Sequence, residues 1–370
     1  MLNLPVYLDH AATTFPDEAV ISAMAACMRA QPCNPSAAYS AAGDARRIHR
    51  LARRRIADML ACPPEDVYFT SGGTEANNWA IRAFAGKHVI LSAIEHHSIL
   101  EAARAAGCRV TTVLPDRMGF ISPDAIAAAI SPETKLIALQ WANNETGVIQ
   151  PVREVYALAR SKRIHLHVDA VQAFGHIPVD ASLCDSMSLS AHKLYGPRGV
   201  GALYIRSGAS LSPLLLGGGQ ENGMRAGTEN TPAICGFDVA AGLAQEDMQL
   251  RMERERELLS GFVQQLKKAV PEIILLGEAR ERLPGVAALL LPRISSEAAI
   301  AAMDLKGVMI SGGAACASRS GEPSHVYTSM DLSQEEASRV IRLSIGRHTT
   351  ADQLSYAAEA LISIIAQQAR

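Results

Sequence analysis

Seven short runs rich in apolar and β-branched residues recur between residues 67 and 206, and helix-like stretches follow several of them. The runs are VYFT 67–70, HVILSAI 88–94, RVTTVL 109–114, KLIALQWA 135–142, HLHVDA 165–170, SMSLS 186–190 and GALYI 201–205. Apolar strands that alternate with helices are typical of a mostly parallel sheet with both faces covered. The sequence therefore predicts an α/β fold with a mostly parallel seven-stranded sheet. In such sheets, ligands bind beyond the carboxyl ends of the strands.

The pattern changes near residue 245. Residues 246–270 are dense in charge and have the periodicity of a long amphipathic helix, and shorter strand-like and helix-like segments follow them. We therefore expect a large domain of residues 15–250, and a smaller α+β domain made of residues 1–14 with 251–370. Residues 214–232 are glycine-rich and polar, and a loop of this length is usually functional.

Composition excludes several classes of protein. A net charge of −2 gives no general attraction for nucleic acid, and no apolar run approaches the ~20 residues of a membrane span. The N-terminus lacks the pattern of a secretory signal. The seven cysteines are odd in number and form no CxxC pair, so we expect neither a disulfide scaffold nor a structural metal site. These features predict a cytoplasmic protein that binds neither membrane nor nucleic acid directly.

The stretch FTSGGTEANN, residues 69–78, joins a predicted strand to a predicted helix. Free backbone N–H groups at Gly73 and Thr74, together with the helix dipole, favour a phosphate at this turn. Neither GxxxxGK[ST] nor GxGxxG is present, which argues against a P-loop and weakens a dinucleotide site. An ordinary strand–helix turn capped by Thr74 is the alternative.

A lysine and an aspartate follow two other strands. Lys193, in SLSAHKLYGPRG, becomes a nucleophile where its surroundings favour the neutral amine, although a surface lysine in a turn is the alternative. Asp169 ends an apolar strand, with Gln172 three residues later. A carboxylate at this position suits the cation of a ring nitrogen, whereas capping of the next helix is its commonest role.

Two further strand ends carry polar side chains. His96 lies in EHHSIL, where an imidazole suits either stacking on a flat ring or capping, and Asn144 lies in NNETG, which alone indicates a turn. Together, the strand ends supply a phosphate cradle, a stacking ring, an amide, a carboxylate and a lysine. Pyridoxal 5'-phosphate requires such a set of groups.

The order of motifs along the chain resembles the NifS-like cysteine desulfurases, a group of pyridoxal-phosphate enzymes among the class-V aminotransferases. The matching motifs, between residue 7 and about 350, are LDHAATT, NPSAAYSAAG, FTSGGTEANN, EHHSIL, NNETG, HVDAVQ, SLSAHKLYGPRGVG, GGGQENGMRAGTEN, SGGAACAS, EPSHV and IRLSIGRHTT. The lysine motif alone indicates only a pyridoxal-phosphate enzyme. Three further motifs, namely the loop around Cys316, EPSHV and IRLSIGR, restrict the resemblance to the cysteine desulfurases. The resemblance implies the fold type I of pyridoxal-phosphate-dependent transferases and an obligate homodimer.

The resemblance also implies roles for individual residues. Lys193 would hold the cofactor covalently, Asp169 would face its ring nitrogen, Gln172 its phenolic oxygen, and His96 would stack over the ring. Asn144 would lie between a cofactor oxygen and the substrate carboxylate. The phosphate would be bound by Gly73, Thr74, Ser190 and His192, and by Thr228 of the other subunit.

By the same resemblance, the substrate is L-cysteine and the product is L-alanine. Lys193 would move the Cα proton, His96 would transfer a proton near the sulfur, and Arg342 would bind the substrate carboxylate. The Cys316 thiolate, on a mobile loop of about residues 312–325, would take the sulfur as a persulfide. An acceptor protein would then collect it for iron–sulfur cluster assembly or for thiolation of transfer RNA or cofactors.

The sequence departs from the family pattern at Ala314 and Ala317, where serine and threonine are common, and at His10. Cys33 is the next candidate for the reactive thiol. Three other functions are considered: a selenocysteine lyase, which would tolerate loss of Cys316; another pyridoxal-phosphate transaminase, which would need a keto-acid acceptor; and a non-catalytic scaffold. The intact set of lysine, aspartate, cysteine and arginine argues against the scaffold.

Overall fold

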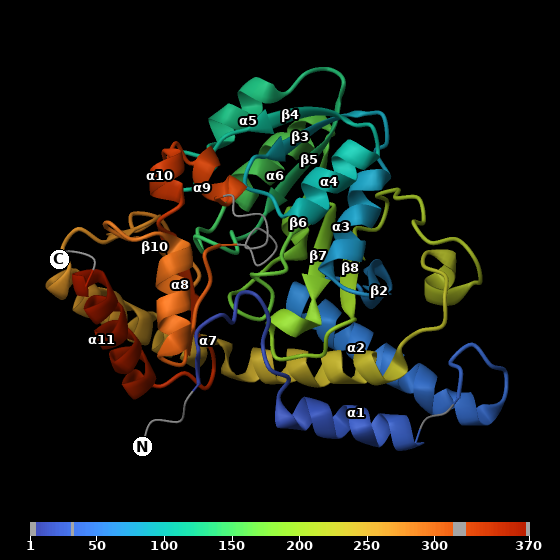
Figure 1. Ribbon diagram of the computed structural model, residues 1–370. Helices are drawn as coiled ribbons and strands as arrows, with labels where there is room; N and C mark the ends of the chain where they lie inside the picture. The colour runs from blue at the N-terminus through green and yellow to red at the C-terminus, as the bar shows by residue number, and fades with distance from the viewer. Residues whose placement is uncertain (1–4, 31–32, 314–322, 368–370) are drawn as a thin grey trace.

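The computed structural model describes residues 5–30, 33–313 and 323–367. A seven-stranded sheet with strand order β2-β8-β7-β6-β5-β3-β4 forms its centre (Figure 1). The strands are β2 (Val67–Thr70), β3 (His88–Ser92), β4 (Arg109–Val113), β5 (Thr134–Gln140), β6 (His165–Asp169), β7 (Ser186–Ser190) and β8 (Gly201–Ile205). Within this sheet β8 alone runs against the others. The predicted mostly parallel α/β sheet is confirmed, and the strand boundaries agree to within two residues.

The sheet is covered on both faces because successive side chains of its strands point to opposite sides. Val89 and Leu91 of β3 pack with α3 and α4, whereas Ile90 packs in the core that contains α2, α6 and α7. The bounds of these helices are α2 (Gly43–Leu60), α3 (Gly73–Arg82), α4 (His97–Ala105), α6 (Val152–Lys162) and α7 (Thr231–Ala269). Both layers leave the carboxyl ends of the parallel strands open.

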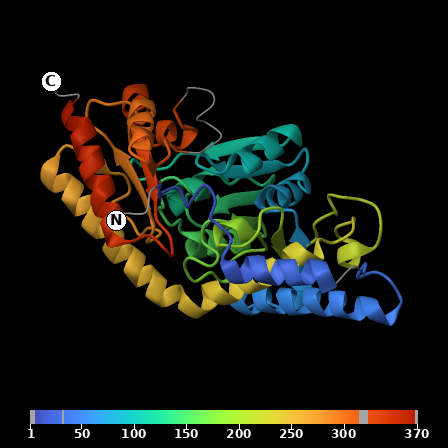
Figure 2. The same cartoon turned by 60° about the horizontal axis from the view of Figure 1, so that its bottom comes forward.

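The helix α7 has 39 residues, which corresponds to about 58 Å at 1.5 Å per residue. Its first half buries Phe237 and Ala240 against the central sheet, and its second half buries Leu259 and Leu266 in a second core. Figure 2 shows α7 running beneath both parts of the molecule. The helix begins well before residue 246, where the sequence predicted its start. The earlier start was not predicted because residues 231–245 are small and apolar on most sides and show no amphipathic contrast.

The second core is built on two small sheets and two helices. It contains Val6 and Leu8 from the N-terminal segment together with residues between 259 and 365. Its elements are β1 (Val6–Tyr7) paired with β11 (Val308–Met309), the sheet β12-β10-β9 (Val340–Ser344, Val286–Leu290, Ile274–Leu275), α8 (Ser296–Leu305) and α11 (Ala351–Gln367). The separate sheets and cores favour the proposed division into two domains, whose exact boundaries stay a prediction.

The remaining helices are α1 (Glu18–Ala30), α5 (Pro123–Ala129), α9 (His325–Ser329) and α10 (Gln334–Ala337). Figure 1 shows α1 lying alongside α7, and α9 and α10 near the open edge of the central sheet. Of the helices in the described residues, none is both long and apolar enough to cross a membrane.

Candidate active site

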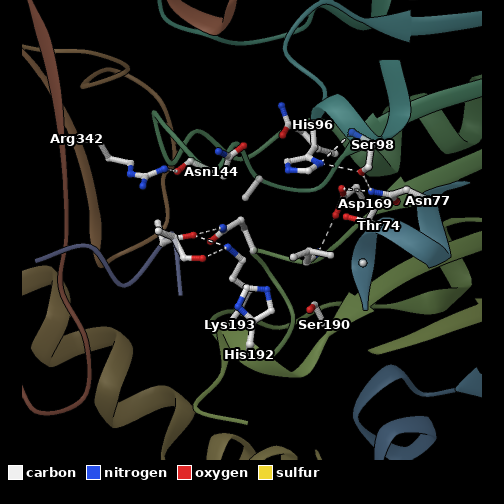
Figure 3. A pocket seen from close by; sticks show the side chains of 17 residues that line it. Thr74, Asn77, His96, Ser98, Asn144, Asp169, Ser190, His192, Lys193 and Arg342 are labelled. Atoms are coloured by element: carbon white, nitrogen blue, oxygen red, sulfur yellow. Dashed lines mark hydrogen bonds between the residues drawn. The ribbon is translucent and has the colours of Figure 1, made fainter. Parts of the chain in front are cut away.

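A cavity of about 300 Å³ opens where the carboxyl ends of β5, β6 and β7 meet the N-termini of α3 and α4 (Figure 3). Ten of the twelve predicted site residues line it: Gly73, Thr74, His96, Asn144, Asp169, Gln172, Ser190, His192, Lys193 and Arg342. Thr228 is exposed on the 214–230 loop and does not line the cavity of its own chain. Cys316, Ala314 and Ala317 lie outside the described residues.

One end of the cavity has the properties of an anion site. Gly73 and Thr74 begin α3, and the preceding Gly72 adopts φ +150°, a conformation that L side chains rarely adopt. No side chain caps this helix, so its first N–H groups remain for a ligand, and the helix dipole favours a negative charge there. Ser190, at the end of β7, and His192 line the same cavity and supply further polar atoms.

Asp169, at the end of β6, is held rigidly. Its side chain accepts hydrogen bonds from Asn77 Nδ2 at 2.7 Å and from the backbone N–H of Val171 at 2.9 Å. Asn77 is 1% exposed and also donates to Ser98 Oγ at 2.8 Å. Asn77 and Ser98 were not among the residues predicted from the sequence. The signal for Asn77 was its spacing of four residues from Gly73, which places both on one face of α3.

Lys193 ends the short 3₁₀ helix that follows β7, and its amine points into the cavity (Figure 3). Lys193 Nζ donates to the carbonyl oxygens of Ala11 and Ala12 at 2.6 and 2.8 Å. Gln172 Nε2 donates to the same Ala11 oxygen at 2.9 Å. The N-terminal segment LDHAATT thus forms one wall of the site. The sequence analysis used this segment only as a family motif and did not assign it a contact.

His96 both lines the cavity and caps α4. Its Nδ1 accepts from the backbone N–H of Ser98 at 3.1 Å, so that nitrogen carries no proton and Nε2 carries one. Burial lowers the pKa of His96 and outweighs the charge of Asp169, which acts in the opposite direction, while the nearby Lys193 also lowers it. The ring is therefore neutral and can donate a hydrogen bond through Nε2. The capping alternative is confirmed, and it coexists with a position in the cavity.

His192 is also neutral near pH 7. Burial lowers its pKa to about 4, and the charges of Lys193 and Arg198 act in the same direction. Its Nδ1 lies 3.1 Å from Thr13 Oγ1. A neutral imidazole at this end of the cavity can donate a hydrogen bond to a phosphate.

Arg342 lies across the cavity from Thr74 and Asn77, next to Asn144 (Figure 3). It is 1% exposed. Its Nη1 donates to the carbonyl oxygen of Asn144 at 3.1 Å, and its Nη2 pairs with Asp9 at 2.6 Å. The guanidinium of Arg342 and the anion-binding N-terminus of α3 therefore lie at opposite ends of one cavity, with the lysine amine between them.

These residues fit pyridoxal 5'-phosphate. The uncapped helix terminus suits the phosphate, the lysine amine suits the aldehyde carbon, and the carboxylate of Asp169 suits the ring nitrogen. The neutral ring of His96 lies beside the space between them. The volume of about 300 Å³ lies at the lower end of the range for pockets that bind small ligands.

Comparison with known proteins agrees with this geometry. Residues 6–356 match the aminotransferase class-V family. The chain is 40% identical over 380 residues to cysteine desulfurase IscS of Clostridium botulinum, covering 99% of this chain and 96% of the relative. It is 41% identical over 371 residues to cysteine desulfurase IscS of Dictyoglomus turgidum, covering 97% and 94% of the two chains.

Solved structures give the same result. A NifS-like protein superposes with a TM-score of 0.92 at 30% identity, covering 98% of this chain and all of the other. A structure of SspA in complex with cysteine superposes with a TM-score of 0.80 at 33% identity, covering 93% of this chain and all of the other. The resemblance read from the motifs is confirmed, and the alternatives of a selenocysteine lyase and another transaminase are not favoured. The chain belongs to the class-V aminotransferase family of pyridoxal-phosphate enzymes, and within it to the cysteine desulfurases of the IscS and NifS-like type.

Proposed function

We propose that this enzyme converts L-cysteine to L-alanine and transfers the sulfur to its own Cys316, from which an acceptor protein collects it. The observation that carries the proposal is the single cavity that unites an anion-binding helix terminus, Lys193, Asp169 and Arg342. The family membership and the cysteine bound in SspA support the same substrate. Bound pyridoxal phosphate supplies an electron sink that acidifies the Cα–H bond and weakens the Cβ–S bond.

The residues of the cavity divide the binding of the cofactor among them. Lys193 would hold it covalently, and Asp169, fixed by Asn77, would keep the ring nitrogen protonated. Gln172 would face the phenolic oxygen with the amide hydrogen that Ala11 does not use. His96 would stack on the ring. The phosphate would lie among Gly73, Thr74, Ser190 and His192.

Two groups would move protons. Lys193 Nζ would take the proton from the substrate Cα, and the carbonyl oxygens of Ala11 and Ala12 orient that nitrogen. The neutral His96 carries a proton on Nε2 and would donate it beside the sulfur, to the Cβ carbon from which the sulfur departs. General acid–base help of this kind contributes about 10²–10⁴-fold to a rate.

In the proposed reaction, the sulfur of the substrate is transferred to Cys316. The thiolate of Cys316 attacks the sulfur of the substrate, an S–S bond forms, and the Cβ–S electron pair stays on the carbon, which is then protonated to give alanine. The described chain before this segment supports the placement. Ser311, three residues before the segment, exchanges backbone hydrogen bonds of 3.1 and 2.6 Å with Arg342, which lines the cavity.

We further propose a homodimer in which Thr228 reaches the phosphate of the partner subunit. Arg225 of the same loop forms two hydrogen bonds, of 2.8 and 3.0 Å, with Glu75 in the first turn of α3. Ile21 and Met28 on α1, and Leu216 in the loop, are exposed apolar side chains of the kind that subunit interfaces cover.

Incubation with L-cysteine, with and without a reductant, tests the function. We expect alanine in both cases, sulfide with the reductant, and a persulfide on the peptide that contains Cys316 by mass spectrometry. Cys316→Ser should abolish the persulfide and keep the cofactor absorbance. A persulfide on Cys33 would instead reassign the nucleophile.

Replacement of the lysine tests the cavity. Lys193→Ala should reduce alanine production to background and leave no covalently attached cofactor, since the proposed attachment site and base are then lost. Lys162→Ala, which changes an exposed lysine at the end of α6, is the control and should keep full activity. Alanine production at the normal rate by Lys193→Ala would refute the assignment.

A further inference from the structure

An ion pair joins the N-terminal segment to the proposed substrate-binding arginine. Asp9 Oδ1 accepts from Arg342 Nη2 at 2.6 Å, and the two side chains are 19% and 1% exposed. A guanidinium this deeply buried requires a negative partner, because removing it from water costs several kcal/mol. In a site without substrate, Asp9 supplies that partner.

The contacts of Arg342 leave part of its guanidinium for a ligand. Nη1 donates to the carbonyl oxygen of Asn144 and Nη2 to Asp9, whereas Nε is buried and has no partner among the described residues. A guanidinium has five N–H groups, so three remain after these two hydrogen bonds. Because Arg342 lines the cavity, the two that remain on Nη1 and Nη2 can bind a carboxylate there.

The backbone of Arg342 is fixed as well. It pairs with Ala288 of β10 on one side and with Ser311 on the other. The direction of the guanidinium is therefore decided at its tip, by Asn144 and Asp9. Of these two contacts, the one with Asp9 is charge-assisted and is the stronger kind.

Asp9 also belongs to the segment that holds the lysine. Two and three residues later, the carbonyl oxygens of Ala11 and Ala12 accept from Lys193 Nζ. Ala11 N–H donates to Ser344 Oγ at 2.8 Å, and Asp9 forms a bridge with Ser344, two residues after Arg342. Residues 9–12 therefore set the spacing between the amine of Lys193 and the guanidinium of Arg342.

We propose that Asp9 is a positioning residue that fixes the guanidinium of Arg342 and thereby gives the enzyme its selectivity for amine substrates that carry a carboxylate. The proposal rests on the proposed function, in which Arg342 binds the substrate carboxylate. Loss of the charge of Asp9 frees the tip of Arg342 and weakens the binding of the carboxylate. Ligands that lack a carboxylate do not use Arg342, so their binding should not change.

Binding of two small amines to the cofactor-loaded enzyme tests this without turnover. L-Alanine has the carboxylate of the product and ethylamine lacks it, and calorimetry measures the dissociation constant of each. Asp9→Asn keeps the size of the side chain and removes its charge. We expect this variant to raise the dissociation constant of L-alanine by about 10-fold, which is the scale of one lost charge-assisted contact. The dissociation constant of ethylamine should stay within about twofold of that of the wild type.

A matched ion pair provides the control. Asp17 pairs with Arg347 at 3.1 Å, its side chain is 20% exposed, and it does not line the cavity. Asp17→Asn should leave the ratio of the two dissociation constants unchanged. Asp9→Ala is the second variant, and the cofactor absorbance and the thermal unfolding of each protein show whether it is folded and loaded.

The outcomes separate the two proposals. Equally weakened binding of both ligands would assign Asp9 a purely structural role. Tighter binding of L-alanine would show that Asp9 competes with the substrate for Arg342. Either result overturns the inference. Unchanged L-alanine binding in Arg342→Lys would instead remove Arg342 from the proposed function. If Arg342→Lys weakens L-alanine and Asp9→Asn does not, the inference about Asp9 alone fails.

Discussion

At the scale of single residues, neutral groups hold two of the charged side chains of the site. The carboxylate of Asp169 is fixed by an amide and a backbone N–H, and the amine of Lys193 by two carbonyl oxygens. These neutral partners orient the two reactive groups toward the cavity. Asn77 is the clearest of these partners, since it contacts Asp169 from inside the core.

Replacement of Asn77 should weaken the binding of the cofactor. Asn77→Ala removes a buried hydrogen bond to a charged group, worth about 1.5–3 kcal/mol, and lets Asp169 rotate. We expect cofactor affinity, measured by absorbance during dialysis, to fall by about 10- to 100-fold. The control is Asn78→Ala, because Asn78 is half-buried on the same helix and, within residues 5–30, 33–313 and 323–367, donates only to the backbone oxygens of Thr74 and Ser98. Equal losses in both variants would argue against a specific role of Asn77.

Sequence patterns identified the residues that follow strands and missed two polar residues of helices α3 and α4 that also line the cavity. Nine of the ten predicted residues that line the cavity end or follow strands of the central sheet, because the carboxyl ends of parallel strands meet at one edge. The tenth, Arg342, lies within β12 of the smaller sheet. Asn77 and Ser98 lie within helical segments, where polar side chains ordinarily face solvent, and the spacing of Asn77 from Gly73 was the one local signal for either residue. Asp9 could not be paired with Arg342 from spacing, since 333 residues separate them.

At the scale of elements, the close approach of β8 to the turn before α3 shapes the phosphate end of the cavity. A Cβ added at Gly201, the first residue of β8, would lie 2.7 Å from Gly72 Cα and closer still to the carbonyl oxygen of Leu189. Only glycine permits this distance between the strand and the turn. Gly73 and Thr74, which line the phosphate end of the cavity, directly follow this turn.

Gly201→Ala should therefore disturb both stability and cofactor binding. Forced expansion at a packed position costs about 1–3 kcal/mol, and the displaced turn would lower the affinity for phosphate. Gly261→Ala is the control, because Gly261 lies in α7 with no atom within 4 Å of an added Cβ. That variant should be stabilised by about 0.5–1 kcal/mol, as measured by denaturant unfolding. A Gly201→Ala protein as stable as the wild type would contradict the contact.

At the scale of the whole molecule, buried neutral histidines couple stability to pH. Burial, together with a smaller effect of the neighbouring His165, lowers the pKa of His167 to about 3. Between pH 3 and 6.5 the unfolded chain binds a proton at this position that the folded chain does not. Stability should therefore fall as the pH decreases below 6.5, by about 1.4 kcal/mol per pH unit for this histidine.

A variant isolates this contribution. Glu95 and Glu255 act in the opposite sense, since burial raises their pKa values to about 8 and about 7 and the folded chain then binds their protons more tightly. We expect His167→Gln to lose less stability than the wild type between pH 6.5 and 5 in denaturant titrations. His348→Gln changes an exposed histidine and should follow the wild type. Parallel curves for His167→Gln and the wild type would contradict the assignment.

The sequence by itself determined the elements that local periodicity encodes: the seven strands, the helices between them, the family and most residues at the strand ends. Alternation and motif order are properties of short segments, and they survive without knowledge of what packs against them. Tertiary structure alone decided that Ala11 and Ala12 hold Lys193, that Asn77 holds Asp169, and that Asp9 holds Arg342. Those contacts join segments that are distant along the chain, and their geometry depends on how the sheets and α7 bring the two cores together.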